Sequence, residues 1–504
     1  MPIIFLIGLL SFNVYIYGDN AISGANQIAL ILSGAIAAII GVKYGVGWKI
    51  IIGGISNNIK SVTPAIIILL LIGALSGTWL ISGIIPAMIY YGLEILNPKI
   101  FLFATCIICA IVSLATGSSW STVATIGISL LAVGQALGIS IGLIAGAIIS
   151  GSYFGDKMSP LSDTTNLAPA MAETDLFKHI KYMMYTTIPS FIITLIIFLF
   201  IGFNYTDNLS TNQISDMLLI ISEKFTITPW LFLVPIIVIL LIIKKVPAIP
   251  SLLFGTMLGA IFAILFQPGI IENNINDNTK PINNYYKIII NSMSDQISFN
   301  ETNNEINNII PIEYKSTQDK IIKISFNEAQ KKSFNHPAKI AAEKRGELLK
   351  SKGMRGMMDT IWLVICAMIF GGAIESTKLL KRISEPIIRY AKSNGNLITT
   401  TAGTCIFFNI TVSDQYLSII IPGKMFKDRY DEKGLDPVNL SRTLEDSGTV
   451  TSVLIPWNTC GAYHQGVLGV STLSYLPYCF FNLLSPLMTI MYAYLNIKIK
   501  KLAK

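Results

Sequence analysis

Long apolar stretches separated by short polar ones run along most of the chain. Stretches of roughly 20 residues can cross the ~30 Å hydrocarbon layer of a membrane as helices, at ~1.5 Å of rise per residue. The pattern predicts helices at 3–17, 26–42, 63–82, 100–115, 121–137, 139–153, 187–203, 229–243, 248–267, 359–377, 397–412 and 474–497. We therefore expect an all-α polytopic membrane protein.

Four further apolar segments, near 84–96, 155–170, 416–426 and 447–470, are interrupted by polar residues. Backbone that leaves the helix at membrane depth must be buried in protein or line a watery cavity, because lipid offers it no hydrogen-bond partner. We expect broken helices at these places. Residues 272–358 differ from the rest, since they are rich in Asn, Lys, Ser and Glu. Such a composition is typical of a hydrophilic loop between two membrane halves.

The two halves resemble each other. Gly73–Thr78 resembles Gly372–Thr377, and Thr105-Cys106 recurs at the same offset as Thr404-Cys405. Trp120–Gly127 matches Tyr416–Gly423 more loosely, and the polar run at Asp156–Ser162 corresponds to that at Asp446–Ser452. The constant order of these matches predicts an internal repeat.

Basic residues predict that the two copies are inverted. Cytoplasmic loops carry an excess of Lys and Arg. Such residues precede the helix at 63–82 (Lys43, Lys49 and Lys60) but follow the matching helix at 359–377 (Lys378, Lys381 and Arg382). Inverted repeats are typical of secondary transporters. The basic segment 339–355 does not fit this arrangement, because it would lie outside the cell.

The predicted organisation has five parts. Residues 1–60 form N-terminal membrane helices, and 61–205 form the first inverted repeat. Connecting membrane helices occupy 206–271, the hydrophilic loop occupies 272–358, and the second inverted repeat occupies 359–504.

Composition supports the membrane assignment and limits which partners and bound groups we expect. Of the 504 residues, 52% are hydrophobic and 13% are charged, with a mean hydropathy of +0.60, whereas soluble domains carry about 25% charged residues. The net charge of +8 comes from Lys and Arg in short loops, so we expect membrane lipid and no nucleic acid as partner. The three His are scattered and most of the six Cys lie in apolar or motif segments. We expect no disulfide framework, no resident metal and no cofactor.

Four polar clusters carry the candidate chemistry: 116–122, 155–169, 409–415 and 445–459. An ionisable residue at membrane depth costs several kcal/mol and indicates function. Hard cations such as Na⁺ bind oxygen ligands, which carboxylates, amides, hydroxyls and the carbonyls of a broken helix supply. The ion-binding candidates are Asp156, Asp163, Asn166, Asp414, Asp446 and Asn458. Supporting polar groups are Ser118, Ser119, Ser162, Thr164, Asn409, Thr449 and Thr451.

Simpler roles for these acids stay open at this point. Asp156 could pair with Lys157 in a loop, and Asp163 could cap a helix start. Glu445 and Asp446 could pair with Arg442. A carboxylate that binds either Na⁺ or a proton would couple the two fluxes directly.

At these motifs the chain resembles the NhaC family of sodium–proton antiporters. The resemblance is carried by 115–120, by the long run at 151–169, and by 445–452 with 455–460. It implies exchange of Na⁺ for H⁺ by alternating access in the cell (inner) membrane, through two inverted repeats with re-entrant hairpins and unwound helices. It also implies a homodimer.

Other functions compete with this hypothesis. The family resemblance extends to sodium-coupled antiporters of small organic anions or amino acids, of the malate–lactate type, which form the main alternative. An integral-membrane enzyme would need a nucleophile–base or metal constellation, and none is visible in the sequence, so we expect no enzyme. A passive channel is disfavoured because broken inverted repeats suit alternating access.

Overall fold

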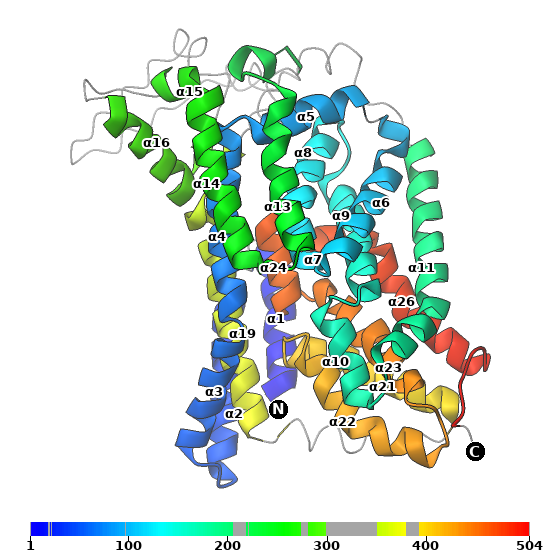
Figure 1. Ribbon diagram of the computed structural model, residues 1–504. Helices are drawn as coiled ribbons and strands as arrows, with labels where there is room; N and C mark the ends of the chain where they lie inside the picture. The colour runs from blue at the N-terminus through cyan, green and yellow to red at the C-terminus, as the bar shows by residue number, and fades with distance from the viewer. Residues whose placement is uncertain are drawn as a thin grey trace, which may run out of the picture.

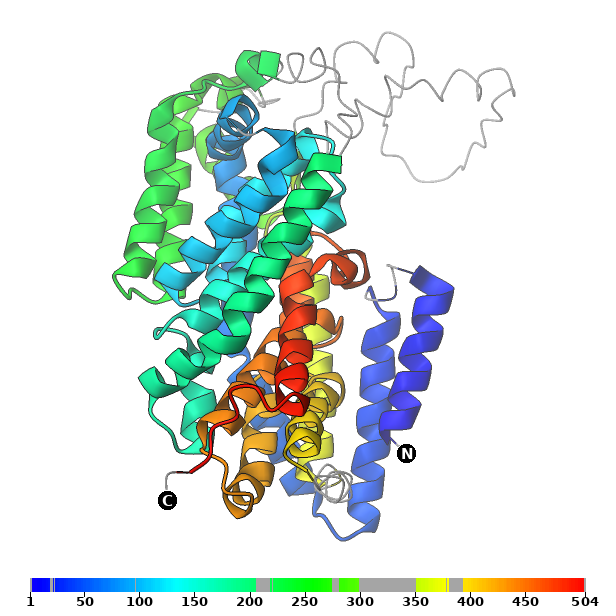
Figure 2. The ribbon, with the colours of Figure 1, turned by 90° about the vertical axis from the view of Figure 1, so that its right-hand side faces the viewer.

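The computed structural model describes residues 2–18, 21, 23–95, 97–204, 218–219, 221–273, 281–298, 350–377, 379 and 393–502. This part of the chain is a bundle of helices that stand side by side, with one short two-stranded sheet (Figures 1 and 2). Six of its helices are long and apolar enough to cross a membrane, or seven if the bent pair 472–478 and 480–494 is one span. The prediction of a polytopic all-α membrane protein is confirmed.

One side of the bundle is built from the N-terminal helices and a helix of the second half. It contains α1 (Pro2–Tyr17), α2 (Ala25–Lys43), α3 (Trp48–Ser61), α4 (Thr63–Ile81) and α19 (Met358–Ser376). Both α2 and α3 pack on α19, and Gly54 allows this because a Cβ there would lie 3.1 Å from the carbonyl oxygen of Gly372. The helix α3 was not among the predicted helices.

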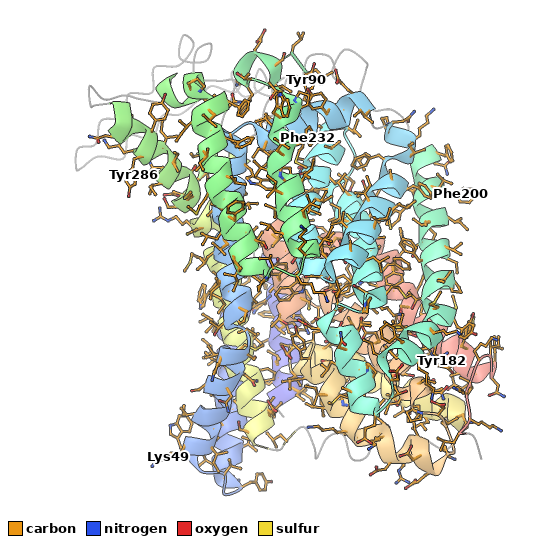
Figure 3. The ribbon with its side chains drawn as sticks, viewed as in Figure 1. Lys49, Tyr90, Tyr182, Phe200, Phe232 and Tyr286 are labelled. Atoms are coloured by element: carbon orange, nitrogen blue, oxygen red, sulfur yellow. The ribbon has the colours of Figure 1, made fainter. Side chains whose placement is uncertain are left out.

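A second group packs on α4 at the end of the bundle opposite Lys49 (Figure 3). It comprises α5 (Ile84–Ile95), η3 (Pro229–Phe232), α13 (Leu233–Ile243), α14 (Ala248–Phe266), α15 (Pro268–Asn273) and α16 (Pro281–Ser294). The Trp79 indole on α4 donates to the carbonyl of Gly255 on α14 at 3.2 Å. Residues 281–294 lie in the predicted hydrophilic loop, yet they pack on α4, where Gly77 meets the backbone of Ser292.

The only sheet in the described residues joins two segments of that predicted loop. Strands β1 (Ile297–Ser298) and β2 (Lys350–Ser351) are antiparallel, with Ile297 opposite Ser351. The Ser351 hydroxyl lies 2.9 Å from that of Ser76 on α4. The short helix η5 (Met354–Met357) then leads into α19.

The centre of the first half is a tightly packed helix pair with a broken neighbour. Its elements are α6 (Pro98–Thr116), α7 (Ser119–Thr122), η2 (Val123–Gly127), α8 (Ile128–Ala136), α9 (Ile141–Met158), α10 (Asp163–Ala172) and α11 (Leu176–Asn204). A Cβ at Gly155 of α9 would lie 2.4 Å from the carbonyl oxygen of Ala110 of α6. Glycine therefore permits the close α6–α9 contact that brings the end of α9 beside α7.

The second half has shorter pieces. They are α21 (Asn394–Thr411), α22 (Leu417–Glu432), α23 (Val438–Leu444), the π-helical turn η6 (Glu445–Thr449), η7 (Ser452–Leu454), α24 (Thr459–Leu468), α25 (Thr472–Tyr475), η8 (Leu476–Tyr478) and α26 (Phe480–Tyr494). Helical geometry changes twice between 445 and 454, and this confirms the expected break near 447–470. The chain also breaks at 159–162, between α9 and α10.

Two of the expected interruptions are wrong. The segment near 84–96 is one continuous helix, α5, and the segment near 416–426 lies in α22, which includes Pro422. A proline removes one backbone hydrogen bond but does not always end a helix, because neighbouring groups satisfy the freed carbonyl. The six cysteines are free and buried.

Two pairs of helices, each with one member from either half of the chain, run antiparallel. Gly73, late in α4, packs on Gly353 just before α19, whereas Val62, just before α4, shares an apolar cluster with Ile374 near the end of α19. Likewise Phe198, late in α11, packs on Phe480 at the start of α26. The repeat boundaries themselves stay a prediction, and the basic residues at 378, 381 and 382 lie outside the described residues.

Candidate ion-binding site

Asp156, near the end of α9, is held by the start of α7. Its carboxylate accepts the Ser119 backbone N–H at 3.0 Å and the Ser119 hydroxyl at 2.6 Å. The carboxylate faces the positive end of this short helix turn, and Ser118 caps the turn by accepting from the N–H of Ser121 at 3.2 Å. The side chain is buried. The structure therefore places a buried carboxylate where the first-half break begins.

Two hydroxyls link this region to the second half. Ser162, the N-cap of α10, lies 3.2 Å from the Thr164 hydroxyl, which donates to Glu445 Oε1 at 3.1 Å. Glu445 is fully buried at the start of η6. Among the described residues its Oε2 has no hydrogen-bond partner. A buried carboxylate oxygen without a donor is the kind of group that takes a cation or a proton.

Asp446 forms a buried ion pair with Lys157 of α9, and both side chains are fully buried. Asp446 also accepts from Thr186 of α11 at 2.8 Å and from Thr489 of α26. The Lys157 ammonium donates to Ser485 at 2.9 Å. The pair and its hydroxyl partners tie η6 and α26 of the second half, together with α11, to the end of α9. We call Asp156, Lys157, Glu445 and Asp446 the carboxylate cluster.

An amide network holds the unwound backbone beside this cluster. Asn409 donates to the carbonyl of Gly448 at 2.7 Å and to the hydroxyl of Thr451 at 3.0 Å, and its own side-chain oxygen accepts from Asn458 at 3.1 Å. Asn458 in turn caps α24 through the N–H of Cys460. All three predicted residues of this network are buried, and they satisfy the backbone between η6 and α24.

The remaining predicted residues lie at the starts of α10 and α22 or within η6. Asp414 is buried and accepts the N–H of Leu417 at 2.9 Å, so it caps the start of α22. Asp163 is exposed in the first turn of α10, and exposed Asn166 donates to the carbonyls of Pro160 and Ser162. Thr449 is buried in η6, where its carbonyl accepts from Gln415 at 3.1 Å.

Sequence reasoning missed two members of the carboxylate cluster. Lys157 was considered only as a neighbour for Asp156, and it pairs instead with Asp446. Glu445 was considered only as a partner of Arg442, whose guanidinium donates to the carbonyl of Lys498 at 3.4 Å. The signal was present in the sequence, because Lys157 and Glu445 are ionisable residues inside the two polar clusters that align in the repeat.

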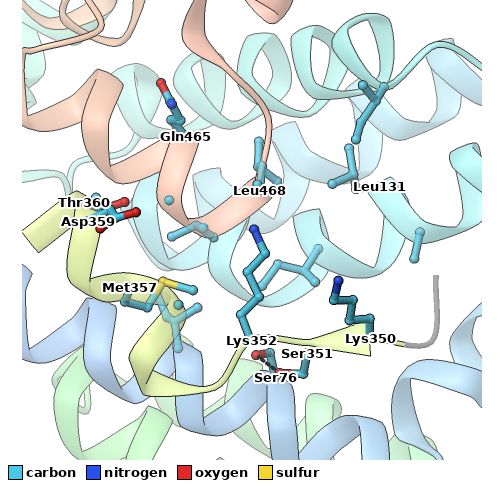
Figure 4. Close-up of a pocket in the computed structure, with 18 of the residues that line it drawn as sticks. Ser76, Leu131, Lys350, Ser351, Lys352, Met357, Asp359, Thr360, Gln465 and Leu468 are labelled. Carbon is cyan, nitrogen blue, oxygen red and sulfur yellow. Dashed lines mark hydrogen bonds between the residues drawn. The ribbon is translucent and has the colours of Figure 1, made fainter. Parts of the chain in front are cut away.

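A cavity of about 430 Å³ with a mixed polar and apolar lining lies between α4, α8, the start of α19 and the end of α24. Lys350 of β2 and Lys352, just after that strand, line this cavity together with Asp359 and Gln465 (Figure 4). Two residues before Gln465, Tyr463 stacks on Trp120 with ring centroids 4.0 Å apart and donates to the Trp120 carbonyl. Trp120 follows Ser119, which holds Asp156, so this aromatic stack lies next to the carboxylate cluster.

A resident metal centre is not evident in the described residues, where no group of three or more His, Cys, Asp or Glu side chains is placed to hold one. The carboxylate cluster is instead mixed, with one lysine among three acids and several hydroxyls. That donor set suits a monovalent ion that binds and leaves.

Three relatives match nearly the whole chain. A protein named Na⁺/H⁺ antiporter NhaC from Alkalihalophilus pseudofirmus is 37% identical over 94% of this chain and 91% of its own. A malate-2H⁺/Na⁺-lactate antiporter of Bacillus subtilis is 35% identical over 97% of this chain and 92% of its own. An arginine/ornithine antiporter of Halobacterium salinarum is 32% identical over 97% of this chain and 90% of its own.

A comparison with protein-family models also identifies an antiporter family. The model of the Na⁺/H⁺ antiporter family matches residues 151–275 and 329–497, which include both parts of the carboxylate cluster. With its apolar helices and these relatives, the chain is a multi-pass protein of the cell membrane. It belongs to the Na⁺/H⁺ antiporter family.

Proposed function

We propose that this protein exchanges Na⁺ for H⁺ across the cell membrane by alternating access. The observation that carries the proposal is the charge of the carboxylate cluster. Asp156, Glu445 and Asp446 are buried beside a single buried ammonium, that of Lys157. Two negative charges are left without a cationic partner within the cluster.

Such an imbalance cannot persist in a low-dielectric interior. An unpaired buried carboxylate costs several kcal/mol, so it takes up either a proton or a cation. Asp446 already has Lys157 as its counter-ion, and therefore Asp156 and Glu445 are the groups we assign to the exchanged ions. Na⁺ and H⁺ then compete for the same oxygens, and this competition couples the two fluxes.

The oxygens around these two acids form a suitable cage. Ser162 and Thr164 stand between them, and Glu445 Oε2 is unused by the described residues. The π-helical and 3-10 turns from 445 to 454 shift backbone carbonyls out of regular helical pairing. Hydroxyls, carboxylates and freed carbonyls are the ligands that Na⁺ takes in broken-helix transporters.

Alternating access requires two parts that move against each other around the site. The antiparallel course of α4 and α19, and of α11 and α26, supports a pair of inverted repeats. Asp156 belongs to the first and Glu445 to the second. A rocking motion between the repeats would therefore change the distance between the two acids and release the ion.

The test is transport by purified protein in liposomes with a trapped pH dye and an imposed proton gradient. Na⁺ should collapse the gradient in the wild type, K⁺ should not, and Asp156→Asn should respond to neither. A wild-type protein that is folded and inserted but does not respond to Na⁺ would overturn the proposal.

A second candidate is a sodium-coupled antiporter of small organic anions or amino acids. One relative is named a malate-2H⁺/Na⁺-lactate antiporter and another an arginine/ornithine antiporter, and the cavity with Lys350 and Lys352 has the charge to receive a carboxylate. A gradient collapse that needs Na⁺ together with malate, lactate or arginine would favour this candidate.

The homodimer implied by the family resemblance is also a proposal. Light scattering of the detergent-solubilised protein tests it, with a mass of two chains expected after subtraction of the detergent. A mass of one chain would refute it. We further propose that the transported ions are the only small ligands that the transport cycle needs.

A further inference from the structure

A second cavity lies away from the carboxylate cluster, at the end of the bundle that carries Lys49 and Tyr182 (Figure 3). It has a volume of about 460 Å³ and lies between the start of α11, the start of α23 and the tail after α26. Its lining is basic and aromatic, namely Lys178, Lys181, Tyr182, Tyr185, Val438, Lys498, Ile499 and Lys500.

The lysines of this cavity face one acid. Asp436 accepts from Lys178 at 3.1 Å and from Lys500 at 3.3 Å. Burial of Asp436 works against its charge, but the Val438 N–H and these two lysines bring the pKa of its carboxyl below the usual range. Asp436 thus stays charged and orders two lysines, while Lys498 extends over the Tyr185 ring at 4.7 Å. The cavity keeps a clear excess of positive charge.

Arg442, which is buried behind the side chains that line the cavity, adds to this excess of positive charge. Its guanidinium is fully buried and stacks 4.7 Å from the Tyr182 ring, which lines the cavity. One nitrogen donates weakly to the Lys498 carbonyl, but in the described part of the chain Nε and Nη2 have no acceptor. A buried cation without a counter-ion raises the potential of the neighbouring cavity and favours an anion there.

An apolar surface continues from the cavity along α11. Tyr185, Ile188, Ile192 and Ile196 follow each other at helical spacing and are all at least 36% exposed. Helix α11 lies at the edge of the bundle (Figure 1), so this stripe faces lipid. A ligand with an anionic head and an acyl chain would match both features.

We propose that this basic cavity binds the phosphate headgroup of an anionic phospholipid, with one acyl chain along the α11 stripe. Basic pockets between membrane helices suit such headgroups. The bound lipid joins α11 to the tail and to α23.

This site has a direct connection to the carboxylate cluster. Thr186, one turn after Tyr182 on α11, donates to Asp446. Arg442 on α23 directly precedes the turn η6 that carries Glu445 and Asp446. An anionic lipid that fixes α11 against α23 therefore stabilises the surroundings of the Lys157–Asp446 pair.

The test compares lipid binding by the wild type, by a Lys181→Gln/Lys498→Gln variant, and by a Lys49→Gln/Lys60→Gln control. All four lysines lie on exposed positions of the structure, so each variant should fold. The detergent-solubilised proteins are titrated with short-chain phosphatidylglycerol, phosphatidylcholine or inorganic phosphate, and both native mass spectrometry and thermal unfolding are recorded.

We expect phosphatidylglycerol to bind the wild type and the control alike and to raise their unfolding temperature. Binding to the Lys181→Gln/Lys498→Gln variant should be roughly tenfold weaker. Equal binding to all three proteins, or equal effects of phosphatidylcholine, would overturn the proposal. Protection by inorganic phosphate at the same concentration would also overturn it, because a free anion would then account for the site.

Discussion

Asp156 and Asp446 occupy corresponding places in two similar polar segments, but their surroundings differ. Asp156 is held by the N–H and hydroxyl of one serine and has no ion-pair partner among the described residues. Asp446 is fully buried and is held by a lysine and three hydroxyls from α11 and α26. The difference supports our proposal that Asp156 takes part in ion exchange, whereas Asp446 anchors the fold through its ion pair.

The largest expected effect on stability follows from breaking the Lys157–Asp446 ion pair. Lys157→Met leaves Asp446 buried without its counter-ion and should lower the free energy of unfolding by about 3–5 kcal/mol. Thermal and denaturant unfolding in detergent would measure it. Adding Asp446→Leu should restore most of that stability, because an apolar pair of similar volume has no charge to bury. A change below about 1 kcal/mol for Lys157→Met alone would contradict the role of the pair.

The next effect concerns transport and not stability. Asp156→Asn should lower Na⁺-dependent proton exchange by roughly a hundredfold or more, because the site loses a charge at membrane depth. Asp163→Asn serves as the matched control, since Asp163 lies seven residues later but is exposed on α10. It should keep exchange within a few-fold of wild type in the same liposome assay. Equal losses in both variants would remove the distinction between the two acids.

A smaller effect is expected from the donor that holds Asp156. Ser119→Ala removes the hydroxyl bond of 2.6 Å but keeps the backbone N–H. One hydrogen bond to a charged group contributes about 1.5–3 kcal/mol, so the Na⁺ concentration for half-maximal exchange should change roughly tenfold or more. Ser118→Ala is the control, because Ser118 caps α7 without touching Asp156. An unchanged Na⁺ dependence in Ser119→Ala would show that this serine does not position the carboxylate.

The smallest effect lies far from the carboxylate cluster. The pKa of Asp436 is below its ordinary value, so its contribution to stability is present above that ordinary pKa and is lost as pH falls through the folded-state pKa. Asp436→Asn should therefore cost about 1 kcal/mol at neutral pH, where its partly exposed lysine partners are screened by water. The difference from wild type should vanish in acid. If the unfolding free energies of the two proteins instead differ by the same amount at every pH, the loss of stability comes from altered packing and not from the charge of Asp436.

Sequence reasoning predicted the long helices well because apolar length alone decides them. The segments 63–82, 248–267 and 359–377 match α4, α14 and α19 closely. It failed at α3, which was not among the predicted helices, and at α22, where an interruption was expected near 416–426. Both are helices because packing on α19 and α21 outweighs local preference.

The candidate site was predicted in part. Asp156, Asp446 and Asn409 were chosen from their motifs, and the structure buries all three. The pairing of Lys157 with Asp446 was not foreseen, because it joins the two halves of the chain and no local spacing encodes it. Nor did the sequence separate buried Glu445 from exposed Asp163, since burial at a helix break depends on which helices surround it.

The most direct test of the central claim is proton release on Na⁺ binding by the purified protein in weakly buffered detergent. If Na⁺ and H⁺ compete for Asp156 and Glu445, NaCl should release protons from the wild type whereas choline chloride should not. Asp156→Asn and Glu445→Gln should each reduce the release, and Asp163→Asn should leave it unchanged. No proton release from the wild type, or the same release from all variants, would contradict the claim.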